Sequence, residues 1–421
     1  MMYLLYFMVA KSILVTIEST TQKHIKLLNL PFPMGLQDLV HGVLPSQEIK
    51  EAIQEGWIDI KYSEEVEKKI QPASMDATIE DRCVRVPHGF RPAVGQTIEK
   101  ALKRLSKHDK KEYDISNDFL IQQGFSWYFP IKGTYRLPKG FWLKSSPKST
   151  QGRLGNFVRM IADGIPNYDE IKDPFEGKIG VIVQPRVFSA VVRPDISFNQ
   201  LRWFYGIETK LPHNDLVREY LKHDLLYLNN GAVPLREINP DTGLPLSLDL
   251  EGEFTDGLIG FKARRTHEAV PLYAVREIPF EDFFEEVRKP KEGRLILGPL
   301  DKLYLLASRE RVRVPPHLAA ELEAYETKHG ELRFHEAGFF DPGFGHGENG
   351  DIQGSSAVLE IHSKETEPYP LVHGQGVSSL YFEWLRQIPD KVYGPKIGST
   401  YQNQIGAMVA KPFTVPKELQ N

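Results

Sequence analysis

The chain carries a weak internal duplication. Four short segments of its first half recur in the same order in its second half, at offsets of 173, 177, 176 and 179 residues. The paired segments are 72–76 with 245–249, 136–138 with 313–315, 180–184 with 356–360, and 199–204 with 378–382. This period is far longer than that of a solenoid repeat. We therefore expect two copies of one domain, and not an array of small repeats.

Length and charge narrow the class of protein. The chain has 421 residues, of which 41% are hydrophobic and 26% charged, a balance typical of globular proteins and not of disordered ones. With 52 Lys+Arg and 56 Asp+Glu the net charge is −4, so nucleic acid is not an expected partner. The duplication predicts an extension at 1–33, a first repeat at 34–210 and a second repeat at 211–421.

The N-terminal segment 1–16 is apolar, but Lys11 interrupts it and no basic leader precedes it. It is also too short for a membrane span. We interpret 1–33 as an extension, with an upstream start codon or a short strand as the two explanations. No other segment resembles a span, so we expect a cytoplasmic protein without a membrane partner.

Each copy has the pattern of a β domain. Short runs rich in Val, Ile, Phe and Tyr alternate with turns, and the chain contains 33 Gly and 30 Pro. Strands are predicted at 83–86, 180–183, 190–193, 258–262, 357–361 and 369–372. Apolar spacing predicts helices at 47–55, 98–105, 215–222, 280–288 and 317–328, with 215–222 bridging the copies. A mainly β fold follows, with a barrel or jelly-roll-like domain in duplicate and a few short helices.

A polar loop at 144–155 is the first candidate for chemistry. Hydroxyl groups, two lysines and Arg153 share this loop with a proline and two glycines, and such a loop can bind phosphate. It lacks the spacing of a P-loop. Taken alone, the loop is better explained as a solvated turn.

The second candidate is 337–345, followed by Glu360 within an apolar strand. A carboxylate among apolar strand residues is costly unless it is exposed, paired or protonated, and burial would raise its pKa as suits a proton shuttle. The alternative is a solvated face of an edge strand. The first copy carries Gln184 at the matching position.

The third candidate is the segment 393–404, whose aromatic, amide and lysine side chains suit a lid over a ligand. A disordered tail is the alternative. Four histidines also gather in the second copy, at His335, His346, His362 and His373. Their spacing fits no metal motif, and the single cysteine, Cys83, excludes a zinc site built on two thiolates.

In this order the segments resemble the dCTP deaminases of the dUTPase-like superfamily, and most of all their double-length bacterial branch. The resemblance spans roughly residue 35 to the C-terminus and rests on 72–76 (PASMD), 147–155 (PKSTQGRLG), 337–345 (AGFFDPGFG), 358–360 (VLE) and 401–404 (YQNQ). It implies two tandem dUTPase-like distorted β-barrels in a homo-oligomeric hydrolase. The implied reaction converts dCTP to dUTP and ammonia without zinc, with Mg²⁺ accompanying the triphosphate.

The resemblance also implies a role for each matching residue. Glu360 would be the general base on water, Ser149 would position the water or the base, and Arg153 would neutralise developing charge. The carbonyl of Ala337 would help to hold the water, and Asp341 and Phe344 would contact the sugar and base. The phosphates would be bound by Lys148, Thr150, Tyr393, Tyr401 and Gln404. Thr400 stands where many members have lysine, so Lys396 is expected to substitute.

Neither copy holds the full set. The first has Ser149 and Arg153 but Gln184 in place of the base. The second has Glu360, but the segment 324–328 stands in place of the polar loop 144–155, which we call the hydroxyl/Arg loop. We therefore expect one working site per pair of copies. Two alternatives stay open: a bifunctional enzyme that yields dUMP, with Asp341 holding a hydrolytic water, and an inactive nucleotide-binding regulator.

Overall fold

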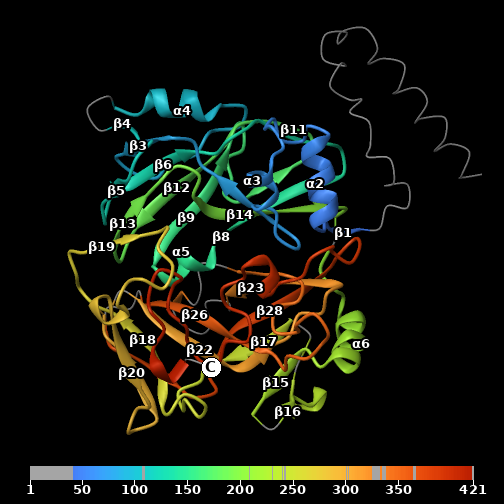
Figure 1. Ribbon diagram of the computed structural model, residues 1–421, viewed down its shortest axis with the longest axis vertical. Coiled ribbons are helices and arrows are strands. Elements are labelled where there is room, and N and C mark those ends of the chain that lie inside the picture. The colour runs from blue at the N-terminus through green and yellow to red at the C-terminus, as the bar shows by residue number, and fades with distance from the viewer. Residues whose placement is uncertain are drawn as a thin grey trace, which may run out of the picture. The chain divides into compact units, whose positions relative to one another are not determined.

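The computed structural model describes most of the chain beyond residue 40, all of it within the unit Val40–Asn421. The described residues are 41–106, 110–207, 209–229, 231–238, 240, 243–299, 301, 303–324, 332–333, 338–363 and 367–419. The predicted extension 1–33, Ala337 and His335 lie outside them. The described chain is mainly β with a few short helices, as predicted (Figure 1).

The first half contains two five-stranded sheets. One has the order β4–β3–β6–β12–β9, from Lys111–Asp114, Arg82–Val86, Ser126–Pro130, Ile179–Pro185 and Asn156–Ala162. The other has β14 (Ser197–Tyr205) between β8 (Phe141–Pro147) and both β1 (Gly42–Val43) and β2 (Met75–Thr78), with β10 (Glu170–Lys172) beyond β8. Smaller pairings join β7 (Tyr135–Leu137) to β11 (Phe175–Gly177), and β13 (Ser189–Val192) to β5 (Phe119–Ile121) and β19 (Ala269–Pro271).

The second half has a seven-stranded and a four-stranded sheet. The larger contains β16, β15, β22, β18 and β20 in that order, from Gly231–Ala232, Leu226–Leu228, Tyr304–Val312, Leu258–Ala263 and Phe284–Arg288. In it, β26 (Ser355–Ser363) pairs with β22 and β24 (Leu332–Arg333). The smaller has the order β17–β28–β23–β25, from Leu244–Ser247, Gly376–Trp384, Leu318–Ala324 and Phe339–Phe340, and β21 (Arg294–Leu297) pairs with β27 (Tyr369–Val372).

The two halves repeat one pairing pattern. In the first, β14 lies between β2 and β8, and in the second, β28 lies between β17 and β23. The β2–β14 and β17–β28 pairs each contain a register shift. Consequently β8, which leads into the hydroxyl/Arg loop, and β23, which leads toward residues 325–331, hold corresponding places in the two sheets. All six predicted strands are confirmed.

Short helices connect these sheets. They are α2 (Ser46–Gln54), α3 (Glu64–Glu67), α4 (Ile98–Arg104), α5 (Ser149–Arg153) and α6 (His213–His223), with 3-10 turns at Leu235–Glu237, Phe280–Asp282, Pro395–Ile397 and Lys417–Leu419. The helices predicted at 47–55, 98–105 and 215–222 are confirmed to within two residues. In the described part of the chain, no helix has the length and apolarity that a membrane crossing requires.

Two predicted helices are wrong. The segment 280–288 forms a 3-10 turn followed by β20, and 317–328 contains β23. The sequence of β23 is rich in Ala, Glu and Leu, which favours a helix locally. However, Leu318, Ala320 and Leu322 pack in the second-half core, while Ala319 joins a cluster with first-half residues. Burial on both faces of a sheet outweighs the local preference.

Candidate active site

Two adjoining cavities lie where the halves meet. The inner cavity has a volume of about 80 Å³ and is lined by Ser149, Arg153, Gln200, Phe339, Phe340, Asp341, Phe344, Ala357, Val358, Glu360, Tyr393, Tyr401 and Gln404. The outer cavity has a volume of about 270 Å³ and is lined by Lys68, Gln71, Asp76, Lys148, Ser149, Thr150, Gln200, Asp341, Tyr393, Ile397, Gly398, Ser399, Thr400, Tyr401 and Lys411. The two share Ser149, Gln200, Asp341, Tyr393 and Tyr401. Residues of both repeats line each of them.

The hydroxyl/Arg loop forms α5, at the boundary between the halves (Figure 1). The helix ends after one turn because Gly155 follows with φ +66°, where a Cβ would come within 2.3 Å of a Val187 methyl. This turn places Ser149 and Arg153 on the inner cavity. The alternative of a solvated loop therefore does not hold, since Arg153 is only 4% exposed.

Arg153 makes its contacts with the second half. Its Nη1 donates to the carbonyl of Met408 at 2.7 Å, and both Nη atoms lie 3.4 Å from Oε1 of Gln404. Its guanidinium also stacks on the Tyr401 ring, 3.6 Å from the centroid. A planar, permanently charged group is thus fixed at the cavity wall by three different contacts.

Glu360 lies on β26, opposite Leu305 of β22, and is 2% exposed. The solvated edge-strand alternative is therefore wrong. Neighbours along the strand, Leu359 and Ile361, point into the second-half core, so the alternation of the strand directs Glu360 to the opposite face. At the matching position of the first half, Gln184 is half-buried and donates to Ser126 Oγ at 2.8 Å.

Asp341 follows β25 and begins the turn that carries Phe344. The turn needs glycine: Gly343 has φ +94°, and a Cβ there would lie 2.8 Å from Val392 Cβ. Phe344 packs edge-on against Phe340, with ring centroids 5.0 Å apart. Burial raises the pKa of Asp341 to about 6, although the Arg202 guanidinium opposes this shift.

Arg202, on β14 of the first half, is fully buried and contacts the Asp341 turn and its neighbouring strands. It donates to the carbonyls of Ala320 and Phe340 at 3.2 Å each and to Glu383 Oε2 at 2.9 Å. Its Nη2 lies 3.7 Å from Asp341 Oδ1. A second link joins the halves nearby, where the Gly338 amide donates to Ser146 Oγ at 3.0 Å. The first repeat therefore fixes the position of the Asp341 turn.

The C-terminal segment closes one side of both cavities. The amide of Tyr401 donates to Tyr393 Oη at 3.2 Å, and the amide of Lys411 donates to Tyr401 Oη at 3.1 Å. Tyr401 and Gln404 are buried, at 6% and 3% exposed. In the described structure this segment is packed against the site, unlike the disordered tail that the sequence left open.

Lysines gather at the outer cavity. Lys68, Lys148 and Lys411 line it, and Lys148 Nζ is paired with Asp76. Burial, together with the neighbouring charge of Lys148, lowers the pKa of the Lys411 ammonium. Lys396 does not line either cavity: its side chain is 78% exposed and its Nζ lies 2.6 Å from Glu348 Oε2.

Most of the residues singled out from the sequence thus come together in one chain. Lys148 and Thr150 lie at the outer cavity, Glu360, Arg153, Phe344 and Gln404 at the inner one, and Ser149, Asp341, Tyr393 and Tyr401 at both. Gln404, expected at the phosphates, contacts Arg153 instead. Sequence reasoning missed Gln200, Arg202, Lys68 and Lys411. Of these, only Gln200 and Arg202 could have been found from the sequence, because they lie in the repeated segment 199–204.

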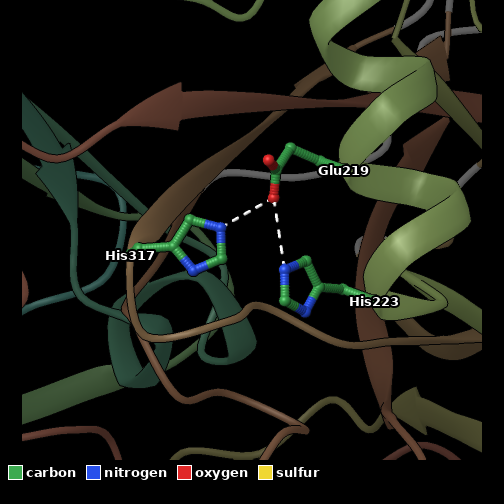
Figure 2. A group of neighbouring side chains, drawn as sticks. All are labelled: Glu219, His223 and His317. Atoms are coloured by element: carbon green, nitrogen blue, oxygen red, sulfur yellow. Dashed lines mark hydrogen bonds and ion pairs between the residues drawn. The ribbon is translucent and has the colours of Figure 1, made fainter.

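Metal-ligand residues cluster elsewhere. Within the described ranges, the one group of three candidate ligands is Glu219, His223 and His317, which lines neither cavity (Figure 2). Cys83 lies buried in β3, and burial raises its thiol pKa to about 12. His346 Nδ1 donates to the carbonyl oxygen of the next residue, Gly347, at 2.7 Å.

Comparison with known families gives matches over both halves. The family model for the N-terminal domain of 2'-deoxycytidine 5'-triphosphate deaminase matches residues 40–207. The model for the C-terminal domain of the same family matches residues 217–413.

Individual proteins give the same result. A dCTP deaminase of Haloarcula marismortui is 32% identical over 149 residues, which are 34% of this chain and 71% of the relative. A dUMP-forming dCTP deaminase of Halobacterium salinarum is 32% identical over 143 residues, 33% of this chain and 68% of the relative. The crystal structure of 2'-deoxycytidine 5'-triphosphate deaminase from Agrobacterium tumefaciens superposes with a TM-score of 0.75 at 32% identity, covering 83% of this chain and 97% of that one. The chain belongs to the 2'-deoxycytidine 5'-triphosphate deaminase family.

Proposed function

We propose that the chain hydrolyses dCTP to dUTP and ammonia at a site built from both of its repeats. The observation that carries this proposal is the inner cavity, where Ser149 and Arg153 of the first half and Glu360 of the second line one space. The family membership and the names of the relatives support the choice of substrate.

The chemistry assigned to these residues is general acid–base catalysis. Water adds to C4 of cytosine while Glu360 takes its proton, and the same carboxyl then returns a proton to the amine, which leaves as ammonia. Ser149 positions the water, with the carbonyl of Ala337 as a second acceptor. Arg153 stabilises negative charge that develops on the ring, a role that suits a cation held by fixed partners in a buried site.

The outer cavity would bind the triphosphate. Lys68, Lys148 and Lys411 supply positive charge, and Thr150 supplies a hydroxyl. Mg²⁺ enters as part of the substrate, bound to the phosphate oxygens. Asp341 and Phe344, at the inner cavity, would contact the sugar and base.

The architecture proposed with this function is two tandem dUTPase-like distorted β-barrels, at 34–210 and 211–421, in a homo-oligomer. The family-model matches at 40–207 and 217–413 support the division. So do the corresponding sheets β2–β14–β8 and β17–β28–β23.

A pair of matched substitutions tests the assignment. Glu360→Gln should abolish ammonia release from dCTP, because the amide cannot accept the proton, with a loss of at least about 10²-fold. Gln184→Glu, at the corresponding place in the first repeat, should leave turnover nearly intact. Turnover of Glu360→Gln at the wild-type rate would contradict the assignment. Binding of dCTP by the wild-type chain without any turnover would instead support a nucleotide-binding regulator.

A second candidate is a dUMP-forming enzyme, favoured by the name of the Halobacterium salinarum relative. In that reaction Asp341 would hold a water for attack on the triphosphate. Product analysis separates the two candidates. Ammonia with intact dUTP supports deamination alone, and ammonia with dUMP and pyrophosphate supports the second candidate.

A further inference from the structure

A cluster of metal-ligand side chains lies outside the site described above. Glu219 and His223 are one turn apart near the C-terminal end of α6, and both extend toward His317, which precedes β23 (Figure 2). Residues four apart lie on the same helix face, so this helix presents two ligands side by side. The third ligand comes from a segment about 100 residues later in the chain.

The distances are close to those of a metal centre. Glu219 Oε2 lies 3.5 Å from His223 Nε2 and 2.7 Å from His317 Nε2, and one candidate ligand atom from each residue lies within 4.8 Å of the others. Bond lengths of 2.0–2.1 Å to Zn²⁺ in a tetrahedral arrangement place ligand atoms roughly 3.4 Å apart. Side-chain shifts of less than about 1.5 Å would therefore bring all three onto one ion.

A second observation points to a missing partner. His223 Nε2 is buried and has no hydrogen-bond partner in the described structure, although the Glu219 carboxylate is 3.5 Å away. The hydrogen bond between Glu219 and His317 leaves this ring nitrogen unsatisfied. A buried polar atom without a hydrogen bond calls for an explanation such as an ion. A cation between the three residues would satisfy all of them at once.

The surroundings tolerate a cation. The C-terminal end of a helix carries partial negative charge, and His223 is the last residue of α6. Arg313 lies nearby, but its Nη atoms donate to the carbonyls of His223 and Gly350 at 2.9 and 3.0 Å. The side chains of Glu219, His223 and His317 are 14%, 24% and 29% exposed, which leaves room for water as a further ligand.

We propose that Glu219, His223 and His317 bind one divalent transition-metal ion of the Zn²⁺ type, with water completing its coordination. Imidazole ligands favour Zn²⁺, Co²⁺ or Ni²⁺ over Mg²⁺, so the Mg²⁺ that accompanies a triphosphate does not compete. The ion is structural and takes no part in deamination: it joins α6 to the start of β23, the strand that pairs with β25 beside Asp341.

Titration of the metal-free full-length protein tests this site. Co²⁺ should bind at one equivalent per chain with a visible absorption band, Zn²⁺ should displace it, and excess Mg²⁺ should not. Glu219→Gln and His317→Gln should each lower the Zn²⁺ affinity at least about tenfold. His213→Gln, an exposed histidine at the other end of the same helix, is the matched control and should keep the wild-type affinity.

Two further readouts guard against misfolded variants. Zn²⁺ should raise the melting temperature of the wild type and of His213→Gln, but not of Glu219→Gln, whose metal-free melting and circular dichroism should match the wild type. A zinc-edge anomalous difference peak should lie between the three side chains. Wild-type affinity in both ligand variants, no saturable binding by the wild type, or a peak elsewhere would overturn the proposal.

Discussion

Asp341 shows how a single side chain of the site responds to its surroundings. It is 8% exposed, and burial raises its pKa to about 6 even though Arg202 is close. In the unfolded chain an aspartate has a pKa of about 3.9. The fold therefore favours the neutral form, and the stability that this preference contributes is fully present below about pH 4 and lost as the pH rises through about 6.

The variant Asp341→Asn, which cannot ionise, tests this shift. Its stability relative to the wild type should rise between about pH 4 and pH 6 and then level off, with a total gain of at most about 3 kcal/mol. Urea unfolding at a series of pH values measures the difference. A difference that does not change with pH would contradict the raised pKa.

Two lysines offer a second test at the residue scale. The resemblance points to Lys396 at the phosphates, whereas the structure puts Lys411 in the outer cavity and Lys396 in solvent beside Glu348. Lys411→Gln should raise the KM for dCTP about tenfold, the loss of a charge-assisted contact of about 1.4 kcal/mol, with a smaller change in kcat. Steady-state kinetics of Lys411→Gln and Lys396→Gln decide between them. A raised KM in Lys396→Gln alone would place the phosphates on the other lysine.

At the scale of elements, β14 of the first half and β28 of the second are joined by a buried ion pair. Arg202 and Glu383 are 0% and 2% exposed, and their side chains are 2.9 Å apart. Burial raises the pKa of Glu383 against the opposing effect of Arg202. Each charge offsets the other, and the carbonyls of Ala320 and Phe340 accept two further hydrogen bonds from Arg202.

Replacing one member of this ion pair should lower the free energy of unfolding more than replacing both members. Arg202→Met leaves Glu383 buried without its cation and should lower the free energy of unfolding by about 3–5 kcal/mol. The double variant Arg202→Met/Glu383→Leu should recover part of that loss, because no unpaired ion remains. Urea unfolding of both single variants and the double gives the coupling. Strictly additive losses would show that the two side chains do not act as a pair.

The elements also show what the sequence could predict. Strands with a clear apolar pattern, such as β12 and β26, were predicted within two residues. β23 was not, because its local sequence favours a helix and only the packing of Leu318 on one face and Ala319 on the other makes it a strand. That packing depends on residues from both halves, which no local window contains.

At the scale of the whole molecule, the unequal motifs of the two copies predicted that residues of both would combine, and residues of both halves line one cavity. Ser149, Arg153 and Glu360 were found from the sequence because they lie in recognisable segments. Lys411 and the group of Glu219, His223 and His317 were not, since their members are brought together only by the fold. A single sequence does not show which residues far apart in the chain come into contact.

The division of the site between repeats has a consequence for assemblies of several chains. In the structure, one chain supplies both Arg153 and Glu360 to the same cavity. A chain that lacks either residue should therefore be inactive even beside a partner that lacks only the other one.

Co-expression of two differently tagged variants, Arg153→Gln and Glu360→Gln, tests this central claim. Mixed assemblies isolated through both tags should release no more ammonia from dCTP than either variant alone, because every cavity lacks one residue. Restored activity in the mixed assemblies would show that working sites form between chains and would contradict a site built within one chain.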